Sequence, residues 1–170
     1  MPSLATAREP ENHVETGREI STRYLECLVL IERLHRRLLD VIKAELDSTR
    51  RSDINSVQAL LLYNIGESEL TAGELRTRGY YLGSNVSYNL KKLVEMGYIH
   101  HERSVHDRRS VRVRLTQKGL EVSKMVTELY AKHIAEVEDE GLLTAADLQG
   151  ANAALLKLEQ FWSRELFYGF

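Results

Sequence analysis

The chain has 170 residues, 43% of them hydrophobic and 28% charged, a composition suited to a folded domain with a core. Its 2 prolines and 10 glycines exclude collagen-like and low-complexity classes, and a single cysteine excludes an internal disulfide. No apolar run approaches the roughly 20 residues of a membrane span, and residues 1–17 lack the apolar stretch of a signal peptide. We therefore expect a cytoplasmic protein that does not enter membranes.

The first predicted element is a long helix over residues 20–46. Its apolar residues recur at alternating spacings of four and three, which is the heptad pattern of a helix that packs along another helix. These residues are Ile20, Tyr24, Cys27, Ile31, Leu34, Leu38 and Val41. After a polar break at Ser48–Ser52, we expect Asp53 to cap a helix from Ile54 to Ile65, which Gly66 ends.

The next two predicted helices form a helix-turn-helix. Thr71 and Glu74 have the spacing of a capping box for a short helix that ends near Arg78. After a glycine-bearing turn, Ser84 is expected to cap a second helix that runs to Met96. The residues of this second helix that should face inward are Val86, Leu90 and Leu93.

A two-stranded hairpin should follow. Residues 98–104 and Val111–Leu115 look extended, and in the second segment valine and leucine alternate with Arg112 and Arg114. The charged segment 105–110 would form the tip. A helix-turn-helix followed by a basic hairpin is the element order of a winged helix.

Two further helices complete the predicted fold, over residues 116–139 and after a capping box formed by Thr144 and Asp147. The fold class is mainly α with a small β-wing: a winged helix-turn-helix plus N- and C-terminal dimerisation helices. The predicted divisions are a flexible tail (1–17), a dimerisation helix (18–52), a DNA-binding domain (53–118) and C-terminal dimerisation helices (119–170).

The predicted divisions differ in net charge. Residues 71–118 contain ten Lys/Arg and four Asp/Glu, a local charge of +6, whereas residues 119–170 contain four and nine, a charge of −5. A basic centre between acidic ends predicts a localised surface for a polyanion.

Double-stranded DNA is the polyanion that this element order favours. The second helix would enter the major groove, where short or planar polar side chains reach base edges and lysines reach phosphates. Slim, permanently charged arginines at the hairpin tip suit the minor groove, and Asp107 would brace one of them. The predicted DNA contacts are Ser84, Asn85, Ser87, Tyr88, Asn89, Lys91, Lys92, Arg108 and Arg109.

Several motifs resemble the MarR family of bacterial regulators. The segments that carry the resemblance are Asp107-Arg108-Arg109-Ser110, the run Val113-x-Leu115-Thr116-x-x-Gly119, Leu70-Thr71 with Glu74-Leu75, Ser84-Asn85-Val86-Ser87, and Leu93 followed by Gly97-Tyr98-Ile99. A narrower resemblance is to the MarR-type branch that controls L,D-transpeptidase genes. Tyr80-Tyr81, Tyr88 and Asn89 depart from common family residues, so the resemblance does not imply an operator sequence.

The resemblance implies a homodimer on a palindromic operator and a small-molecule effector pocket between the dimerisation and DNA-binding lobes. Four residues would border such a pocket, and each also has an ordinary packing role open to it: Tyr24, His35, Tyr63 and His133. Cys27 is similarly open to two interpretations, a redox sensor or a small packed residue. No cofactor is expected beyond this effector.

No metal site is expected from the histidines. His100 and His101 are adjacent on a predicted strand and so point to opposite faces, and the two cannot easily share one ion. For these two, His106 and Glu102, structural or solvent-facing roles are favoured.

The function expected from these features is a ligand-responsive DNA-binding regulator, with repression favoured over activation. One alternative is a winged-helix protein-interaction module, which would not need the basic segment. The other is an enzyme, but the chain lacks glycine-rich phosphate loops and the HExxH and GxSxG motifs, so we expect no catalytic activity.

Overall fold

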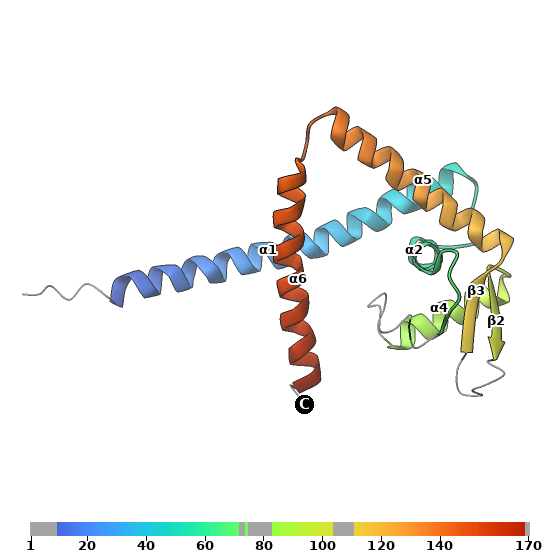
Figure 1. The fold of residues 1–170 in the computed structure, drawn as a ribbon, viewed down its shortest axis with the longest axis horizontal. Coiled ribbons are helices and arrows are strands. Elements are labelled where there is room, and N and C mark those ends of the chain that lie inside the picture. The colour runs from blue at the N-terminus through green and yellow to red at the C-terminus, as the bar shows by residue number, and fades with distance from the viewer. Residues whose placement is uncertain (1–9, 72–73, 75–82, 104–110, 169–170) are drawn as a thin grey trace, which may run out of the picture. The chain divides into compact units, whose positions relative to one another are not determined.

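The computed structural model describes residues 10–71, 74, 83–103 and 111–168. Within these ranges the described elements, shown in Figure 1, are α1 (Pro10–Ser48), α2 (Ser56–Ile65), β1 (Leu70–Thr71), α4 (Gly83–Glu95), β2 (Ile99–Arg103), β3 (Val111–Leu115), α5 (Gln117–Asp139) and α6 (Ala145–Tyr168). The predicted fold class, mainly α with a small β-wing, is confirmed. The chain divides into two compact units, Met1–Ser123 and Lys124–Phe170. None of the described helices is long and apolar enough to cross a bilayer.

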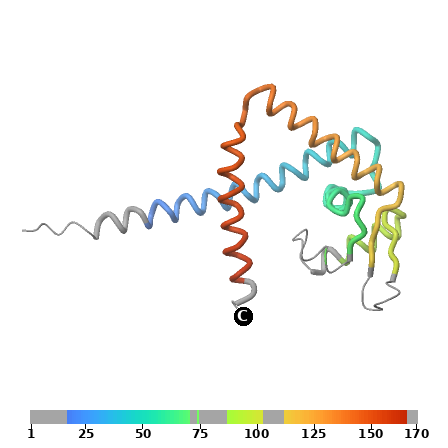
Figure 2. The backbone as a smooth tube through the Cα atoms, viewed as in Figure 1, coloured from blue at the N-terminus to red at the C-terminus, as the bar shows by residue number. Residues whose placement is uncertain are grey.

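Helix α1 is longer than the heptad pattern predicts. It begins at Pro10 and continues for 39 residues. Figure 2 traces the coloured part of α1 without a break. Proline suits a first helical turn because its missing N–H has no helical partner there. Residues 10–17, within the range predicted as a tail, belong to this helix. At the other end, Arg50 adopts a left-handed conformation with φ of 55°, and the Arg51 N–H donates to the Leu46 carbonyl.

Helix α2 has a different cap from the one predicted. The Asn55 side chain accepts a hydrogen bond from the Gln58 N–H at 2.9 Å, and the Gln58 side chain accepts from the Asn55 N–H at 3.1 Å. This reciprocal pair is a capping box, so Asn55 replaces Asp53 as the N-cap. Gly66 ends the helix with φ of 57°, as expected.

The wing belongs to a three-stranded sheet of order β1-β3-β2, one strand more than predicted. The predicted hairpin is confirmed: β2 and β3 are antiparallel, with Ile99 opposite Leu115 and Arg103 opposite Val111. The added strand β1 pairs Leu70 with Val113. Thr71, predicted to cap a helix, is the last residue of this strand. An N-cap residue has an extended backbone, so the predicted cap stays a prediction. Apart from Glu74, the helix expected after Thr71 lies outside the described residues.

The core of the first unit lies between α2, α4 and the sheet. Helix α4 packs on β2, α2 packs on β3, and the C-terminal end of α1 packs on α2. Helix α4 ends at Glu95, and the φ of 76° at Gly97, two residues later, allows the Tyr98 N–H to reach the Leu93 carbonyl at 2.8 Å. The largest fully buried side chains between residues 42 and 115 are Ile42, Leu46, Leu61, Leu62, Ile65, Leu93, Tyr98 and Val113.

Helices α5 and α6 begin where their sequence signals place them. The Thr116 hydroxyl accepts from the Gly119 N–H at 3.2 Å at the start of α5. At α6, Thr144 accepts from the Asp147 N–H at 3.2 Å and its own N–H donates to the Asp147 carboxylate at 2.9 Å. The Thr144 hydroxyl also donates to this carboxylate at 2.6 Å, and this hydrogen bond, together with the one from the Thr144 N–H, lowers the pKa of the Asp147 carboxyl. The reciprocal contacts confirm the predicted capping box.

Helices α1 and α6 leave many apolar side chains in solvent. On the predicted heptad stripe of α1, Ile20 and Leu34 are each 64% exposed. On α6, Leu156 is 54% exposed. Other exposed apolar residues on the two helices are Leu25, Val29, Leu30, Val41, Leu148, Leu155 and Phe161.

Candidate nucleic-acid interface

Helix α4 has a buried side and a polar, solvent-facing side. Leu90 and Leu93 are buried, and at about 100° of rotation per residue they lie on one side of the helix. Tyr88, Lys91 and Glu95 are spaced by three, four and seven positions and so lie together on the opposite side. Tyr88 is 62% exposed there. The helix therefore presents a continuous polar stripe directed away from the core.

The described DNA-contact candidates on α4 lie around this stripe. Ser87 and Lys91 are exposed, while Asn89 and Lys92 are half-buried. The backbone of Ser84–Asn85 forms the first turn of the helix, which begins one residue earlier than predicted, at Gly83. The structure thus places seven of the predicted contact residues on one helix: Ser84, Asn85, Ser87, Tyr88, Asn89, Lys91 and Lys92.

The remaining candidates belong to the hairpin tip. Asp107, Arg108 and Arg109 lie outside the described residues, and so does His106. Their roles stay predictions. The two strands that carry the tip are described, and on β3 the predicted alternation is confirmed, with Val113 buried and its neighbour Arg114 exposed.

Acidic side chains pair with the cations of this region. Lys92 Nζ lies 3.1 Å from a Glu95 carboxylate oxygen, and Lys91 Nζ lies 4.0 Å from the other. On the sheet, Arg112 pairs with Glu69 at 3.2 Å. Arg114 forms an ion pair with Glu102 at 3.3 Å. The count of +6 over residues 71–118 did not reveal this pairing, although the spacing of Glu95 from the two lysines is visible in the sequence.

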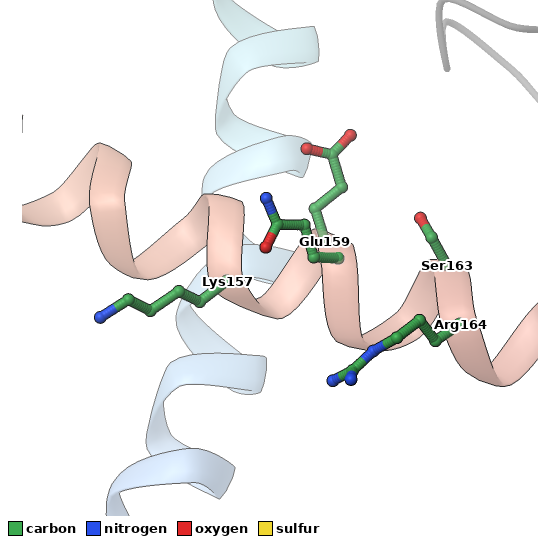
Figure 3. Close-up of a pocket in the computed structure, with 5 residues that line it drawn as sticks. Lys157, Glu159, Ser163 and Arg164 are labelled. Atoms are coloured by element: carbon green, nitrogen blue, oxygen red, sulfur yellow. The ribbon is translucent and has the colours of Figure 1, made fainter.

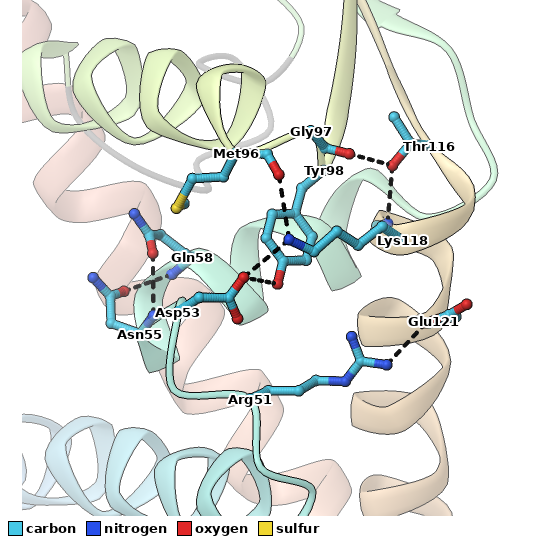
Figure 4. A network of polar contacts seen from close by, with 11 residues as sticks. Arg51, Asp53, Asn55, Gln58, Met96, Gly97, Tyr98, Thr116, Lys118 and Glu121 are labelled. Atoms are coloured by element: carbon cyan, nitrogen blue, oxygen red, sulfur yellow. Dashed lines mark hydrogen bonds and ion pairs between the residues drawn. The ribbon is translucent and has the colours of Figure 1, made fainter.

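A polar network fixes the base of α4 against two neighbouring segments (Figure 4). The Asp53 carboxylate accepts a hydrogen bond from the Tyr98 hydroxyl at 2.8 Å and another from Lys118 Nζ at 2.9 Å. Lys118 Nζ also lies 4.0 Å from the centre of the Tyr98 ring and donates to the Met96 carbonyl at 3.3 Å. The loop before α2, the turn after α4 and the first turn of α5 are thereby held together.

These contacts, together with the burial of Tyr98, shift the pKa values of Asp53, Lys118 and Tyr98. The hydrogen bond from Lys118 lowers the pKa of the Asp53 carboxyl. The same hydrogen bond raises the pKa of Lys118. Burial raises the pKa of Tyr98, and its hydrogen bond to Asp53 adds to this effect. Near neutral pH the network therefore holds a carboxylate, an ammonium and a neutral phenol.

Further hydrogen bonds, made by Thr116, hold the start of α5 in place. The Thr116 hydroxyl donates to the Gly97 carbonyl at 2.7 Å, and the Thr116 N–H donates to the Tyr98 carbonyl at 3.0 Å. This carbonyl approaches Gly119 so closely that a Cβ at this position would lie 2.2 Å from its oxygen. Gly119 is therefore required by packing rather than by a positive φ. Arg51 adds an ion pair to Glu121 at 2.9 Å.

The four effector candidates are distributed over three helices. Tyr24 and His35 lie on α1, separated by about 16 Å along the helix axis at 1.5 Å per residue, so the two do not line one small pocket within a protomer. Tyr63 lies on α2 and His133 on α5. Tyr24, Tyr63 and His133 are half-buried, whereas His35 is exposed.

Two shallow hollows lie on single helices and contain none of these candidates. One is formed by polar side chains of α6, among them Lys157, Glu159 and Arg164 (Figure 3). The other follows α1 between Thr22 and Arg33 and is mainly apolar.

Cys27 is a half-buried free thiol on α1. Within the described ranges, no group of three or more His, Cys, Asp or Glu residues could hold a metal ion.

Comparison with known proteins identifies the architecture. A family model described as a winged helix DNA-binding domain matches residues 54–119. The Exopolysaccharide II synthesis transcriptional activator ExpG of Rhizobium meliloti is 37% identical over 153 residues, which cover 90% of this chain and 78% of that protein.

Two solved structures have the same fold. Streptococcus pneumoniae FabT in complex with DNA matches with a TM-score of 0.65 at 21% identity, over 82% of this chain and 97% of its own. A mutant of E. coli MarR complexed with operator DNA matches with a TM-score of 0.63 at 20% identity, over 80% and 95%. The chain belongs to the family of winged-helix transcription regulators that includes this rhizobial activator, and its fold is MarR-like.

This family membership bears on two sequence-based predictions about the regulator. Its relatives are transcription regulators, which confirms that the chain is not an enzyme. None of the relatives named above is described as a regulator of L,D-transpeptidase genes, so that narrower resemblance stays a prediction.

Proposed function

We propose that this regulator binds double-stranded DNA sequence-specifically, with α4 in the major groove and the β2–β3 hairpin against the backbone or minor groove. The observation that carries the proposal is the polar stripe of α4, exposed opposite a buried side and followed directly by the hairpin. FabT and MarR, which share this fold, were solved in complex with DNA. Bacterial promoter DNA lies in the cytoplasm, so the proposed activity belongs there.

The regulator acts as a homodimer in this proposal. Isolated exposed apolar residues are common on monomers, but α1 and α6 each carry several along their length. A second copy of the chain would remove these side chains from water, and it would present two α4 helices to a palindromic operator. Half-sites should then be about 34–36 Å apart, one turn of the duplex.

The direction of regulation has two candidates. Repression follows when the operator overlaps the promoter, and it is the outcome expected from the sequence. The rhizobial relative is named a transcriptional activator, and its 37% identity over most of both chains favours activation as the second candidate. In vitro transcription from the native promoter distinguishes them, since added protein lowers the transcript level in one case and raises it in the other.

An effector would act by favouring a spacing of the two α4 helices that does not match successive major grooves. Tyr24, Tyr63 and His133, the half-buried candidates, are the first positions to vary when such a ligand is sought. Oxidation of Cys27 is a separate trigger, to be tested by comparing DNA affinity before and after peroxide treatment in wild type and Cys27→Ser.

The test of the proposed function is selection of duplexes from a random DNA pool, followed by titration at several salt concentrations. We expect a palindrome and an affinity that falls steeply with salt, because phosphate contacts release counterions. Binding that is indifferent to both sequence and salt would favour the alternative, a protein-interaction module.

The wing makes a separate prediction. Arg109→Ala should weaken operator binding at least about tenfold, the effect of losing roughly 1.4 kcal/mol of phosphate or groove contacts, while the dimer stays intact. Fluorescence anisotropy with a labelled operator measures the affinity. Size-exclusion chromatography checks the dimer, and normal affinity in this variant would remove the wing from the binding surface.

A further inference from the structure

A carboxylate lies on the face of α4 that the proposed function assigns to DNA. Tyr88 and Glu95 are seven residues apart, close to two helical turns, so their directions differ by only about 20°. Both point away from the side that buries Leu90 and Leu93. The Glu95 side chain is 46% exposed. An acid in this position is unfavourable for any polyanion that approaches the stripe.

Glu95 engages both lysines of the helix. One carboxylate oxygen accepts a hydrogen bond from Lys92 Nζ at 3.1 Å, and the other lies 4.0 Å from Lys91 Nζ. The hydrogen bond to Glu95 raises the pKa of Lys92, so this lysine is held charged and paired. Two cations and one anion therefore form a compact cluster next to Tyr88.

Helix stability does not account for this arrangement. Glu95 is the last residue of α4, where the helix dipole favours cations and disfavours carboxylates. Both lysines precede the glutamate, which is the weaker order for an ion pair on a helix. Exposed pairs of this kind contribute little to folding. Glu95 is thus better explained by its effect on what binds the stripe.

We propose that Glu95 is a specificity-determining residue, which withholds Lys91 and Lys92 from phosphates until base contacts position the duplex. This inference rests on the proposed function of α4. A non-specific complex consists almost entirely of phosphate contacts, so it loses most when its lysines are already paired. In an operator complex, hydrogen bonds to base edges hold the phosphates near the lysines and displace the carboxylate.

The experiment compares wild type with Glu95→Gln on two duplexes of equal length: the one that the wild type selects from a random pool, and a scrambled version. We expect the affinity for the scrambled duplex to rise about fivefold or more, and its salt dependence to steepen by about one to two phosphate contacts. The affinity for the selected duplex should rise less, so the ratio between the two affinities falls.

Matched variants separate local pairing from overall charge. Glu128→Gln removes the same charge from a Lys–Glu pair on α5, in which Lys124 and Glu128 are 3.6 Å apart, and should leave both affinities nearly unchanged. Adding Lys91→Gln and Lys92→Gln to Glu95→Gln should abolish the gain on the scrambled duplex. Circular dichroism verifies that each variant is folded.

The outcomes distinguish this inference from the function on which it rests. An unchanged scrambled-duplex affinity in Glu95→Gln, or an equal rise on both duplexes, overturns the role of Glu95 and leaves DNA binding intact. The same rise in Glu128→Gln also overturns it. A wild-type protein that binds neither duplex overturns the proposed function and the inference together.

Discussion

The winged-helix region and the long helices bury their apolar residues to very different degrees. Between residues 54 and 115, the side chains of Leu61, Leu93 and Val113 are almost inaccessible to water, and the elements that cover them come from the same unit. On α1 and α6, side chains as apolar as these are about half exposed. A region of the first kind can fold by itself, whereas a surface of the second kind gains free energy only when another surface covers it.

Helix α1 belongs to both categories. Ile42 and Leu46 are buried where the helix packs on α2, while Ile20 and Leu34 on the same helix are exposed. One continuous helix therefore connects the compact domain to the surface that we assign to dimerisation. Changes at its two ends should have separable effects, the first on folding of the domain and the second on assembly.

The largest effect should come from the exposed stripe. Ile20→Gln combined with Leu34→Gln should weaken dimerisation at least roughly thousandfold, or about 4 kcal/mol, because it removes four apolar side chains from the dimer, each contributing about 1 kcal/mol or more for its newly buried part. Sedimentation equilibrium measures the dissociation constant. Arg36→Gln, opposite the heptad stripe of Ile20 and Leu34, is the control and should weaken dimerisation far less. A dimer unaffected by the double variant would remove this stripe from the interface.

The second prediction compares a glycine-to-alanine substitution in the compact domain with the same substitution in helix α6. Gly119→Ala should destabilise the protein by about 3 kcal/mol, since the new Cβ would overlap the backbone oxygen of Tyr98. Gly150→Ala on α6 should instead stabilise by about 0.5 to 1 kcal/mol, because it lies within a helix and has nothing within 4 Å of its Cβ. Urea denaturation of both variants measures the difference. Equal effects would contradict the packing at Gly119.

Patterns that repeat along the chain were predictable from the sequence. The heptads of α1, the alternation of Val113 with its arginine neighbours and the capping box at Thr144 each depend on neighbours within a few residues. The recognition-helix candidates could be placed for the same reason. What the heptads cannot show is whether the covering surface comes from this chain or from a second copy.

Features that depend on tertiary contacts were missed or assigned incorrectly. Asp53 has the residue type of an N-cap, but its partners Tyr98 and Lys118 are 45 and 65 residues away in sequence. The Asn-x-x-Gln pattern that does cap α2, at Asn55 and Gln58, was visible locally. Strand β1 has only two residues and therefore no period to detect.

A smaller effect should come from Asp53. Asp53→Asn keeps an oxygen for the Tyr98 hydroxyl but removes the charge that pairs with Lys118, and it should cost about 1 kcal/mol because the pair is partly exposed. Chemical denaturation at pH 7 measures this difference, with Glu128→Gln as the control for an exposed pair on α5.

The pH dependence of the same pair gives a second readout. The folded pKa of Asp53 is lowered, so its contribution is complete above the unfolded pKa of about 3.9 and is lost as pH falls through the folded value. Wild type and Asp53→Asn should therefore converge in stability as the pH falls through the lowered folded pKa of Asp53. A constant difference between them across the acid range would show that the charge is not what stabilises the network.

The smallest effect tests the junction between the two regions, where α1 ends. Arg50 holds a left-handed conformation that costs a residue with a Cβ about 1 kcal/mol and costs glycine almost nothing. Arg50→Gly should therefore raise stability by a few tenths of a kcal/mol up to about 1, because the added freedom of glycine in the unfolded chain offsets part of the gain. Thermal melting measures the change, with Arg36→Gly in the middle of α1 as the control. The control should lose about 1 kcal/mol, since glycine is unfavourable within a helix. If both variants were destabilised alike, α1 would not end in the left-handed turn at Arg50.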